Sequence, residues 1–292
     1  MAWPEVFERD VPLADGRVIH SYDTGPDSGA SDLTVLWHHG SPQTGRLPDP
    51  LRAAAADRDI RLISYGRPSY GGSSHHPGRS IGSAAGDVAR FVDAAGVTSF
   101  ATMGASGGGP HALACAALLP DRVTAVVTLA GPAPYTTDFD WYRGMVSPRG
   151  PRTAAEGREA RARYAEVDEF DRNCFTAADW AALDGAWASL GADAGHAGQA
   201  GPDGLIDDDV ALMSPWGFDV TQIQTPVLLV HGGEDRVIPV SHSEWLVRRL
   251  PSAEFWLRPR DGHISVLHAV PVALDWLRAL QVGTAEPRSP GD

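Results

Sequence analysis

MGASGGGP, residues 103–110, is the stretch of sequence that decides the fold, and Ser106 stands at its centre. The run before it, residues 99–103 (SFATM), predicts a short buried strand, and the run after it, residues 111–119 (HALACAALL), predicts a helix. A G-x-S-x-G pentapeptide between a strand and a helix is typical of a nucleophile elbow, a sharp turn that exposes the serine hydroxyl. The pentapeptide alone is weak evidence, because glycine and serine are common in loops. The rest of the chain must therefore supply the partners that a nucleophilic serine needs.

The composition indicates an ordinary globular chain that carries excess negative charge. Its 292 residues suit one large domain with an insertion, and 43% of them are hydrophobic and 21% charged. The net charge of −13 argues against nucleic acid or an anionic membrane as a partner. No apolar run approaches the ~18 residues of a membrane span, and the polar start of the chain is unlike a signal peptide. We expect a cytoplasmic protein that acts on a small molecule, with its two cysteines, Cys115 and Cys174, as free thiols; the oligomeric state stays open.

Strand patterns alternate with helix patterns along most of the chain. Strands are predicted at residues 18–23, 33–40, 59–65, 99–103, 123–130, 226–231 and 253–257, and helices at or near 53–58, 81–95, 111–119, 243–250 and 266–280. This alternation predicts an α/β fold with a mostly parallel, doubly wound sheet. Sites in such sheets lie at the carboxyl ends of the strands, and Ser41, Ser106, Asp235 and His263 all come just after a predicted strand.

The segment from residue 132 to residue 214 breaks the alternation. It contains helical patterns at 153–170 and 177–190, followed by a stretch at 191–204 rich in glycine, alanine and aspartate that we expect to be mobile. We interpret the segment as a helical cap over the sheet edge of a core formed by residues 1–131 and 215–282; the alternative is two ordinary helices of the main domain. Residues 283–292 lack apolar side chains to bury, and we expect a disordered tail there.

Ser106 needs a base, a group that orients the base, and donors for an oxyanion. His263 follows the last predicted strand and is the candidate base, with His268, one helical turn later, as the alternative. Asp235 is the candidate orienting acid, with the adjacent Glu234 as the alternative. The order serine, aspartate, histidine along the chain differs from that of chymotrypsin and subtilisin. The backbone N–H groups of Ser41 and Gly107 are the candidate oxyanion donors.

Five motifs together resemble those of the α/β-hydrolase fold superfamily, over a region from residue 18 to about residue 280. They are HGSP at 39–42, YGRPSYGGS at 65–73, GASGG at 104–108, HGGED at 231–235 and DGH at 261–263. The resemblance implies a serine triad that requires no cofactor and no metal. HGSP is similar to the oxyanion motif of epoxide hydrolases and haloalkane dehalogenases, whose nucleophile is an aspartate, so Ser106 argues against both activities. Proline iminopeptidases usually carry tryptophan where this chain has Gly108, which argues against aminopeptidase activity.

These patterns predict a serine hydrolase that cleaves a small or medium apolar carboxylic ester through an acyl-enzyme on Ser106. One alternative is other serine-triad chemistry: hydrolysis of a thioester, amide, lactone or carbon–carbon bond, or a lyase reaction. Another is a ligand-binding protein without catalysis, because a fold does not fix function. Trp141 and Trp187 of the predicted cap are candidates for an apolar pocket wall, with helix packing as the alternative role. His38 and His39 are neighbours on a strand and point to opposite faces, which makes them poor joint metal ligands, and His39 is expected to fix a loop. The pair His75–His76 lacks the further ligands that zinc would need, and a surface pair is expected.

Overall fold

The architecture is taken from a computed structural model of the chain, which describes residues 4–25 and 33–284. The strands are β1 (Phe7–Pro12), β2 (Val18–Asp23), β3 (Leu33–His38), β4 (Ile60–Tyr65), β5 (Phe100–Ala105), β6 (Val123–Leu129), β7 (Val227–Gly232) and β8 (Ala253–Arg258). The α-helices are α1 (Asp49–Ala56), α2 (Ser83–Ala94), α3 (Gly108–Leu118), α4 (Arg149–Ala155), α5 (Arg158–Ala165), α6 (Ala177–Asp184), α7 (Ala188–Gln199), α8 (Asp203–Met213), α9 (Ser241–Val247) and α10 (Val270–Thr284). Short 3-10 helices are η1 (Arg172–Cys174), η2 (Val220–Gln222) and η3 (Ser265–Ala269).

The described strands form one eight-stranded sheet in the order β1-β2-β4-β3-β5-β6-β7-β8. Strands β3 to β8 run parallel to one another, and among the described strands the antiparallel pairings are β1 with β2 and β2 with β4. Strands β5 and β7 are buried along their whole length, as expected for inner strands covered on both faces. The predicted fold class, a mostly parallel doubly wound α/β sheet, is therefore confirmed.

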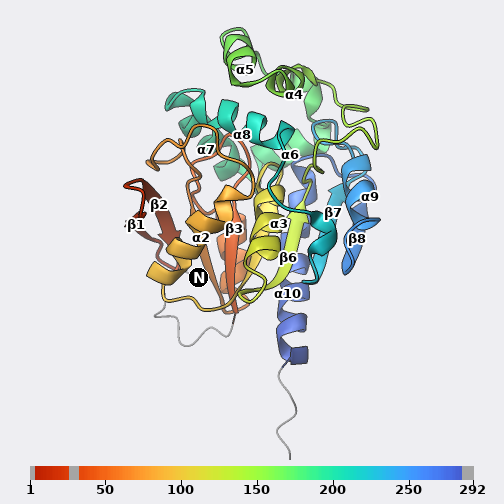
Figure 1. The fold of residues 1–292 in the computed structure, drawn as a ribbon. Helices are drawn as coiled ribbons and strands as arrows, with labels where there is room; N and C mark the ends of the chain where they lie inside the picture. Colours follow the sequence, from red (N-terminus) through yellow and green to blue (C-terminus); the bar gives the residue numbers. More distant parts are fainter. Residues whose placement is uncertain (1–3, 26–32, 285–292) are drawn as a thin grey trace, which may run out of the picture.

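Helices cover both faces of the sheet (Figure 1). Side chains of α2, α3 and α9 share one hydrophobic core with one face of the strands, and side chains of α1 and α10 share a second core with the other face. Helix α3 is buried from Gly108 to Ala116, which its run of small residues permits because the helix can then pack closely on the sheet. The elbow at Ser106 is thereby fixed between two rigid elements.

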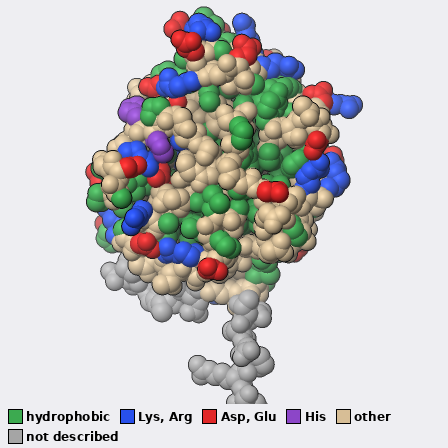
Figure 2. All heavy atoms as spheres, viewed as in Figure 1, with side chains coloured by type: hydrophobic (Ala, Val, Ile, Leu, Met, Phe, Trp, Pro, Cys, Tyr) green, Lys and Arg blue, Asp and Glu red, His purple; other side chains and the backbone are tan. Residues whose placement is uncertain are grey.

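The segment between β6 and β7 contains helices α4 to α8, and we call residues 132–214 the insertion. Figure 1 shows α6, α7 and α8 lying across one edge of the sheet, with α4 and α5 farther out. Acidic and basic side chains are interspersed over the molecular face in Figure 2. None of the described helices combines the length and the apolar character that a membrane span requires.

Three expectations about elements need correction. Strand β1 was not predicted, because five of its six residues are exposed and the strand lacks a clear apolar alternation. No helix was predicted for the stretch 191–204, which we expected to be mobile, but most of it belongs to α7 and the start of α8. Helix α10 continues to Thr284, two residues into the predicted tail, and residues 285–292 lie outside the described part of the chain.

Candidate active site

Ser106 occupies a strained turn between β5 and α3. Its φ is +51°, in the left-handed region that non-glycine residues rarely adopt, and its backbone N–H donates to the carbonyl of Leu129 at 2.8 Å. The turn can form only because the backbones around it approach closely: a Cβ at Gly108 would lie 2.1 Å from the carbonyl oxygen of His38. Backbone strain of this kind persists where the surroundings enforce it, and it is concentrated at functional sites.

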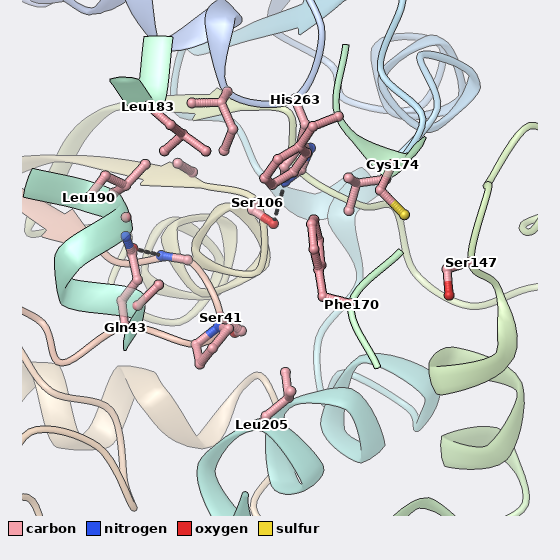
Figure 3. Close-up of a pocket in the computed structure, with 18 of the residues that line it drawn as sticks. Ser41, Gln43, Ser106, Ser147, Phe170, Cys174, Leu183, Leu190, Leu205 and His263 are labelled. Atoms are coloured by element: carbon pink, nitrogen blue, oxygen red, sulfur yellow. Dashed lines mark hydrogen bonds between the residues drawn. The ribbon is translucent and has the colours of Figure 1, made fainter. Parts of the chain in front are cut away.

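The structure brings Ser106, His263 and Asp235 together as one chain of hydrogen bonds. His263 Nε2 lies 3.0 Å from Ser106 Oγ, and His263 Nδ1 lies 2.7 Å from Asp235 Oδ2 (Figure 3). Asp235 Oδ1 accepts from the backbone N–H groups of Val237 and Ile238, both at 2.9 Å. Each carboxylate oxygen therefore has a fixed partner, and the three side chains come from three loops that follow β5, β7 and β8.

The charges around the hydrogen bonds that join Ser106, His263 and Asp235 favour a proton on His263 Nδ1. Burial alone would raise the pKa of Asp235, but the attraction of His263 and hydrogen bonding to His231 and His263 hold that pKa well below its usual range. Burial alone would lower the pKa of His263, but the charge and hydrogen bond of Asp235 outweigh it and raise that pKa above its ordinary value. An anionic Asp235 accepts the Nδ1 proton, which leaves Nε2 free to accept the hydroxyl proton of Ser106.

The two alternative side chains lie elsewhere. Glu234 is exposed, and its backbone N–H donates to the carbonyl of Asp261 at 3.0 Å. His268 is exposed on η3, outside the hydrogen-bond chain that leads to Ser106. The structure therefore places neither the alternative acid nor the alternative base at the nucleophile.

The loop after β3 carries Ser41 against the elbow. An ideal Cβ built on Gly107 would lie 2.8 Å from Ser41 Oγ and 3.9 Å from the Ser41 backbone nitrogen, so the two backbones approach closely. In the described part of the chain, neither the Ser41 N–H nor the Gly107 N–H donates to another protein group. Two unpaired donors beside a serine hydroxyl are what an oxyanion hole requires.

A buried ion pair that the sequence analysis missed supports this loop. Arg67 donates through Nη2 to Asp208 Oδ2 at 2.6 Å and to Ser41 Oγ at 2.9 Å, and through Nη1 to the carbonyl of His39. Ser41 Oγ itself donates to Asp208 Oδ2 at 2.5 Å. Asp208 belongs to α8 of the insertion and is 1% exposed. The motif that contains Arg67 resembles one of the α/β-hydrolase superfamily, but nothing in the sequence links it to an aspartate 141 residues away.

His39 fixes the same loop, as predicted. Its Nδ1 lies 2.6 Å from the carbonyl oxygen of Gly40, and its Nε2 lies 3.0 Å from the backbone nitrogen of Arg67. The carbonyl can only accept and the N–H can only donate, so His39 must be neutral, with its proton on Nδ1. Burial and the nearby Arg67 charge lower the pKa of His39 well below its ordinary value, which agrees with this tautomer.

A cavity of about 580 Å³ lies over Ser106 and His263. The insertion supplies much of its wall, which includes Phe170, Phe175, Leu183, Leu190 and Leu205. In Figure 3, Leu183 and Leu190 lie on one side of Ser106, with Phe170 and Cys174 on the other. Both cysteines are buried and free, and in the described residues no group of three or more His, Cys, Asp or Glu side chains could hold a metal.

Trp141 and Trp187, predicted as candidates for the pocket wall, take instead the alternative role of packing. Trp141 is 2% exposed and donates through Nε1 to the carbonyl of Ala133 at 2.9 Å. Trp187 is 1% exposed and belongs to the hydrophobic core that also contains side chains of α1 and α10. Neither residue lines the cavity over Ser106; Phe175 takes the aromatic position, with its ring parallel to that of His263 at a centroid distance of 6.5 Å.

Known proteins share this architecture. Residues 34–269 match the family model described as alpha/beta hydrolase fold. A non-heme chloroperoxidase of Streptomyces lividans is 27% identical over 246 residues, which cover 78% of this chain and 83% of the relative. A thermophilic esterase from Thermogutta terrifontis has a TM-score of 0.69 at 21% identity, covering 95% of this chain and 99% of the other. The enol-lactonase from Burkholderia xenovorans LB400 has a TM-score of 0.69 at 18% identity, covering 94% and 100%; these two likenesses show the fold alone. With a family model that spans most of its length, the chain is an enzyme of the α/β hydrolase fold family.

Proposed function

We propose that the protein is a serine esterase that hydrolyses a small or medium, neutral, apolar carboxylic ester through an acyl-enzyme on Ser106. The observation that carries the proposal is the hydrogen-bond chain from Ser106 through His263 to Asp235, which opens into the apolar cavity. A serine is a weak nucleophile until a positioned base takes its proton, and this arrangement supplies that base. Residues 132–214 act as the cap that shapes the cavity.

The reaction follows from the positions of the groups. Ser106 Oγ attacks the ester carbonyl carbon while His263 Nε2 takes the hydroxyl proton, and the N–H groups of Ser41 and Gly107 stabilise the oxyanion. The C–O bond to the alcohol then breaks as His263 returns the proton to the leaving oxygen. Water attacks the acyl-enzyme with His263 again as base, which releases the acid and restores Ser106. Asp235 stays anionic and stabilises the imidazolium at each step.

The cavity supports a neutral, apolar substrate. Its volume of about 580 Å³ lies in the range of small-ligand sites, and leucine and phenylalanine side chains form much of its wall. The charged residues that line it are Asp168, Glu169 and Asp171, besides the triad histidine, and the lining contains no arginine or lysine. An anionic acyl group would face these carboxylates without a partner cation, so neutral esters are favoured. A cytoplasmic location and the lack of a nucleic-acid partner stay predictions from the composition.

Turnover of a matched substrate panel tests the proposal. Esters, thioesters, amides and lactones that share one neutral acyl group are offered to wild type and to Ser106→Ala, and the products are identified by mass spectrometry. We expect the esters to be cleaved fastest by wild type, and Ser106→Ala to lose on the order of 10⁶ in rate. A folded Ser106→Ala protein with ordinary turnover would refute the mechanism. Faster cleavage of another class would keep the mechanism and replace the substrate.

A further inference from the structure

A second carboxylate, Asp179 of the insertion, lies against the loop that carries His263. Asp179 stands in the first turn of α6 and is 0% exposed. Burying a carboxylate is unfavourable unless hydrogen bonds replace its lost water. The hydrogen bonds that its two oxygens accept therefore show which parts of the protein this buried carboxylate holds in place.

Oxygen Oδ1 of Asp179 is committed to the residues that follow His263. It accepts from the backbone N–H of Ile264 at 2.9 Å, from the backbone N–H of Ser265 at 2.8 Å and from Ser265 Oγ at 2.8 Å. Ser265 Oγ in turn accepts from the backbone N–H of Gly262 at 2.7 Å. The residues on both sides of His263 are thus tied, directly or through one hydroxyl, to one carboxylate oxygen.

Glycine at position 262 makes this approach possible. An ideal Cβ there would lie 2.1 Å from Asp179 Oδ2, far inside any tolerable contact. The loop that carries His263 and the first turn of α6 therefore fit together only because position 262 has no side chain.

Helix capping is the simpler role for Asp179, but it accounts for only one of the two oxygens. Oδ2 accepts from the backbone N–H and from Oγ1 of Thr176, both at 2.9 Å, and Thr176 Oγ1 accepts from the Asp179 N–H, which completes a capping box. None of these bonds uses Oδ1. The hydrogen bonds to the His263 loop are therefore additional to the cap.

From this geometry we propose that Asp179 is a positioning residue for His263: it holds the loop that directs Nε2 at Ser106 and joins the insertion to the triad. The inference rests on the proposed function, because it concerns the base of that reaction. It also gives the insertion a role beyond enclosing the substrate. The catalytic geometry then depends on a helix that lies outside the sheet.

The charges around His263 give this role a measurable signature. His263 contacts the carboxylate of Asp235 from the loop after β7, and the charge of Asp179 on α6 also acts on it. His231 of β7 lies 3.5 Å from Asp235 Oδ2, and the cavity that His263 lines also contains Asp168, Glu169 and Asp171. Cys174 of η1 shares the cavity, and burial raises the pKa of its thiol, which stays neutral. Burial lowers the pKa of His263, whereas the charges of Asp235 and Asp179 raise it. Burial would raise the pKa of Asp179 itself, but hydrogen bonds from Ser265 and Thr176 lower it, so Asp179 is anionic at neutral pH.

The test measures the second-order rate at which a fluorophosphonate labels Ser106, as a function of pH, for wild type, Asp179→Asn and two controls. Labelling requires a neutral His263, so the rate falls as pH drops through the pKa of that histidine. Asp179→Asn removes one of the two charges that raise this pKa, so its acid limb should move to lower pH. Its plateau should fall by about 10- to 100-fold, because small displacements of a catalytic group have effects of that size.

The controls separate positioning from capping and from charge alone. Thr176→Ala removes the cap partner and leaves Oδ1 untouched, and Asp184→Asn removes an exposed charge at the other end of α6. Both should keep the wild-type plateau and acid limb, even where Thr176→Ala lowers the Tm. The proposal would be overturned if Asp179→Asn had the plateau labelling rate and the acid limb of wild type. It would also be overturned if Thr176→Ala lowered the plateau rate and shifted the acid limb as much as Asp179→Asn does.

A second variant keeps the test decisive if Asp179→Asn does not fold. Ser265→Ala removes one of the three bonds to Oδ1 and keeps the charge, so it should lower the plateau several-fold without moving the limb. An unchanged plateau in Ser265→Ala would then overturn the positioning role. If the proposed function itself were wrong, the result would differ, because wild type would not be labelled at Ser106.

Discussion

Asp235 is anchored independently of the histidine that it orients. Its Oδ1 is held by two backbone N–H groups and its Oδ2 faces His263, so replacing the carboxylate with an amide would preserve its position while placing an N–H donor or a weaker acceptor at His263 Nδ1. We expect Asp235→Asn to keep its fold and to lose on the order of 10⁴ in kcat, because the amide favours the wrong histidine tautomer. The measurement is kcat on the best ester of the panel.

Glu234→Gln is the matched control for this variant, because Glu234 precedes Asp235 and its side chain is exposed. It should change kcat little. If Glu234→Gln lost the larger factor, the orienting acid would have to be Glu234 in a loop conformation different from the one described.

The three residues of the proposed triad could be predicted from sequence because each stands in a local pattern. Ser106 lies between a strand and a helix, and Asp235 and His263 each follow a strand, so the topology of a parallel sheet brings them to one edge. Asp179 and Asp208 could not be predicted, since the spacing of an aspartate in a helix does not reveal which distant loop it meets. Trp187 was misplaced for a related reason: tertiary packing decides whether a large apolar side chain enters a core or a cavity wall.

At the scale of elements, α8 is joined to the core by buried charge. Asp208 of α8 lies between Arg67 and Arg79, at 2.6 and 2.7 Å, and these side chains are 1–3% exposed. Asp208→Ala removes the carboxylate that both guanidinium groups share and leaves Arg79 with the more distant Asp207 at 3.3 Å, so we expect it to lower the free energy of unfolding by about 3–5 kcal/mol. Because Ser41 Oγ also donates to Asp208, turnover should fall at temperatures where the variant is still folded.

Urea unfolding of Asp208→Ala beside Glu159→Ala checks this expectation. Glu159 is exposed and lies 3.8 Å from Arg163, so loss of that surface pair should change stability little. Equal, small effects of the two variants would show that Asp208 does not anchor α8.

The wall of the cavity gives a second prediction at this scale. Phe170, 59% exposed, packs on Phe175 at a centroid distance of 5.0 Å and lines the cavity, whereas Trp187 is buried in the core. Phe170→Ala should change the ratio of kcat/KM values for short and long acyl chains. The change should correspond to about 1–3 kcal/mol, with little loss of stability. Trp187→Ala should lower stability by about 3–5 kcal/mol, and at temperatures where it stays folded it should keep the chain-length profile. If Trp187→Ala changed the chain-length profile and Phe170→Ala did not, Trp187 and not Phe170 would form the pocket wall.

Most core strands and helices were predictable, because their apolar periodicity is strong and their ends carry turn residues. The insertion was predicted less well. No helix was predicted beyond residue 190, where the sequence is rich in glycine, but residues 188–199 (ASLGADAGHAGQ) form α7. Leu190 and Ala197 are buried, and Asp193 accepts from the backbone N–H of Thr44 at 2.9 Å. Tertiary contacts override a weak helix propensity here. Strand β1 was missed because it is an exposed edge with polar side chains.

At the scale of the whole molecule, the net charge of −13 and the carboxylates that line the cavity act in the same direction. Both disfavour anionic substrates, through repulsion on approach and through the lack of a partner cation in the cavity. For a neutral ester and an anionic analogue of equal length, we expect kcat/KM to be at least about 10-fold higher for the neutral ester at low salt, and the difference to narrow as salt screens the charges. Glu169→Gln should also reduce the difference in kcat/KM between the neutral ester and the anionic analogue. Equal kcat/KM values at low salt would contradict this account of specificity.

Covalent labelling shows whether Ser106 is a nucleophile that His263 activates. Intact protein is treated with a fluorophosphonate at neutral pH, and the modified peptide is identified by mass spectrometry. We predict one adduct on Ser106 in wild type, none in Ser106→Ala, and a labelling rate in His263→Gln that is lower by several orders of magnitude. Folded wild-type protein that stays unlabelled, or that carries its adduct on another residue, would contradict the claim.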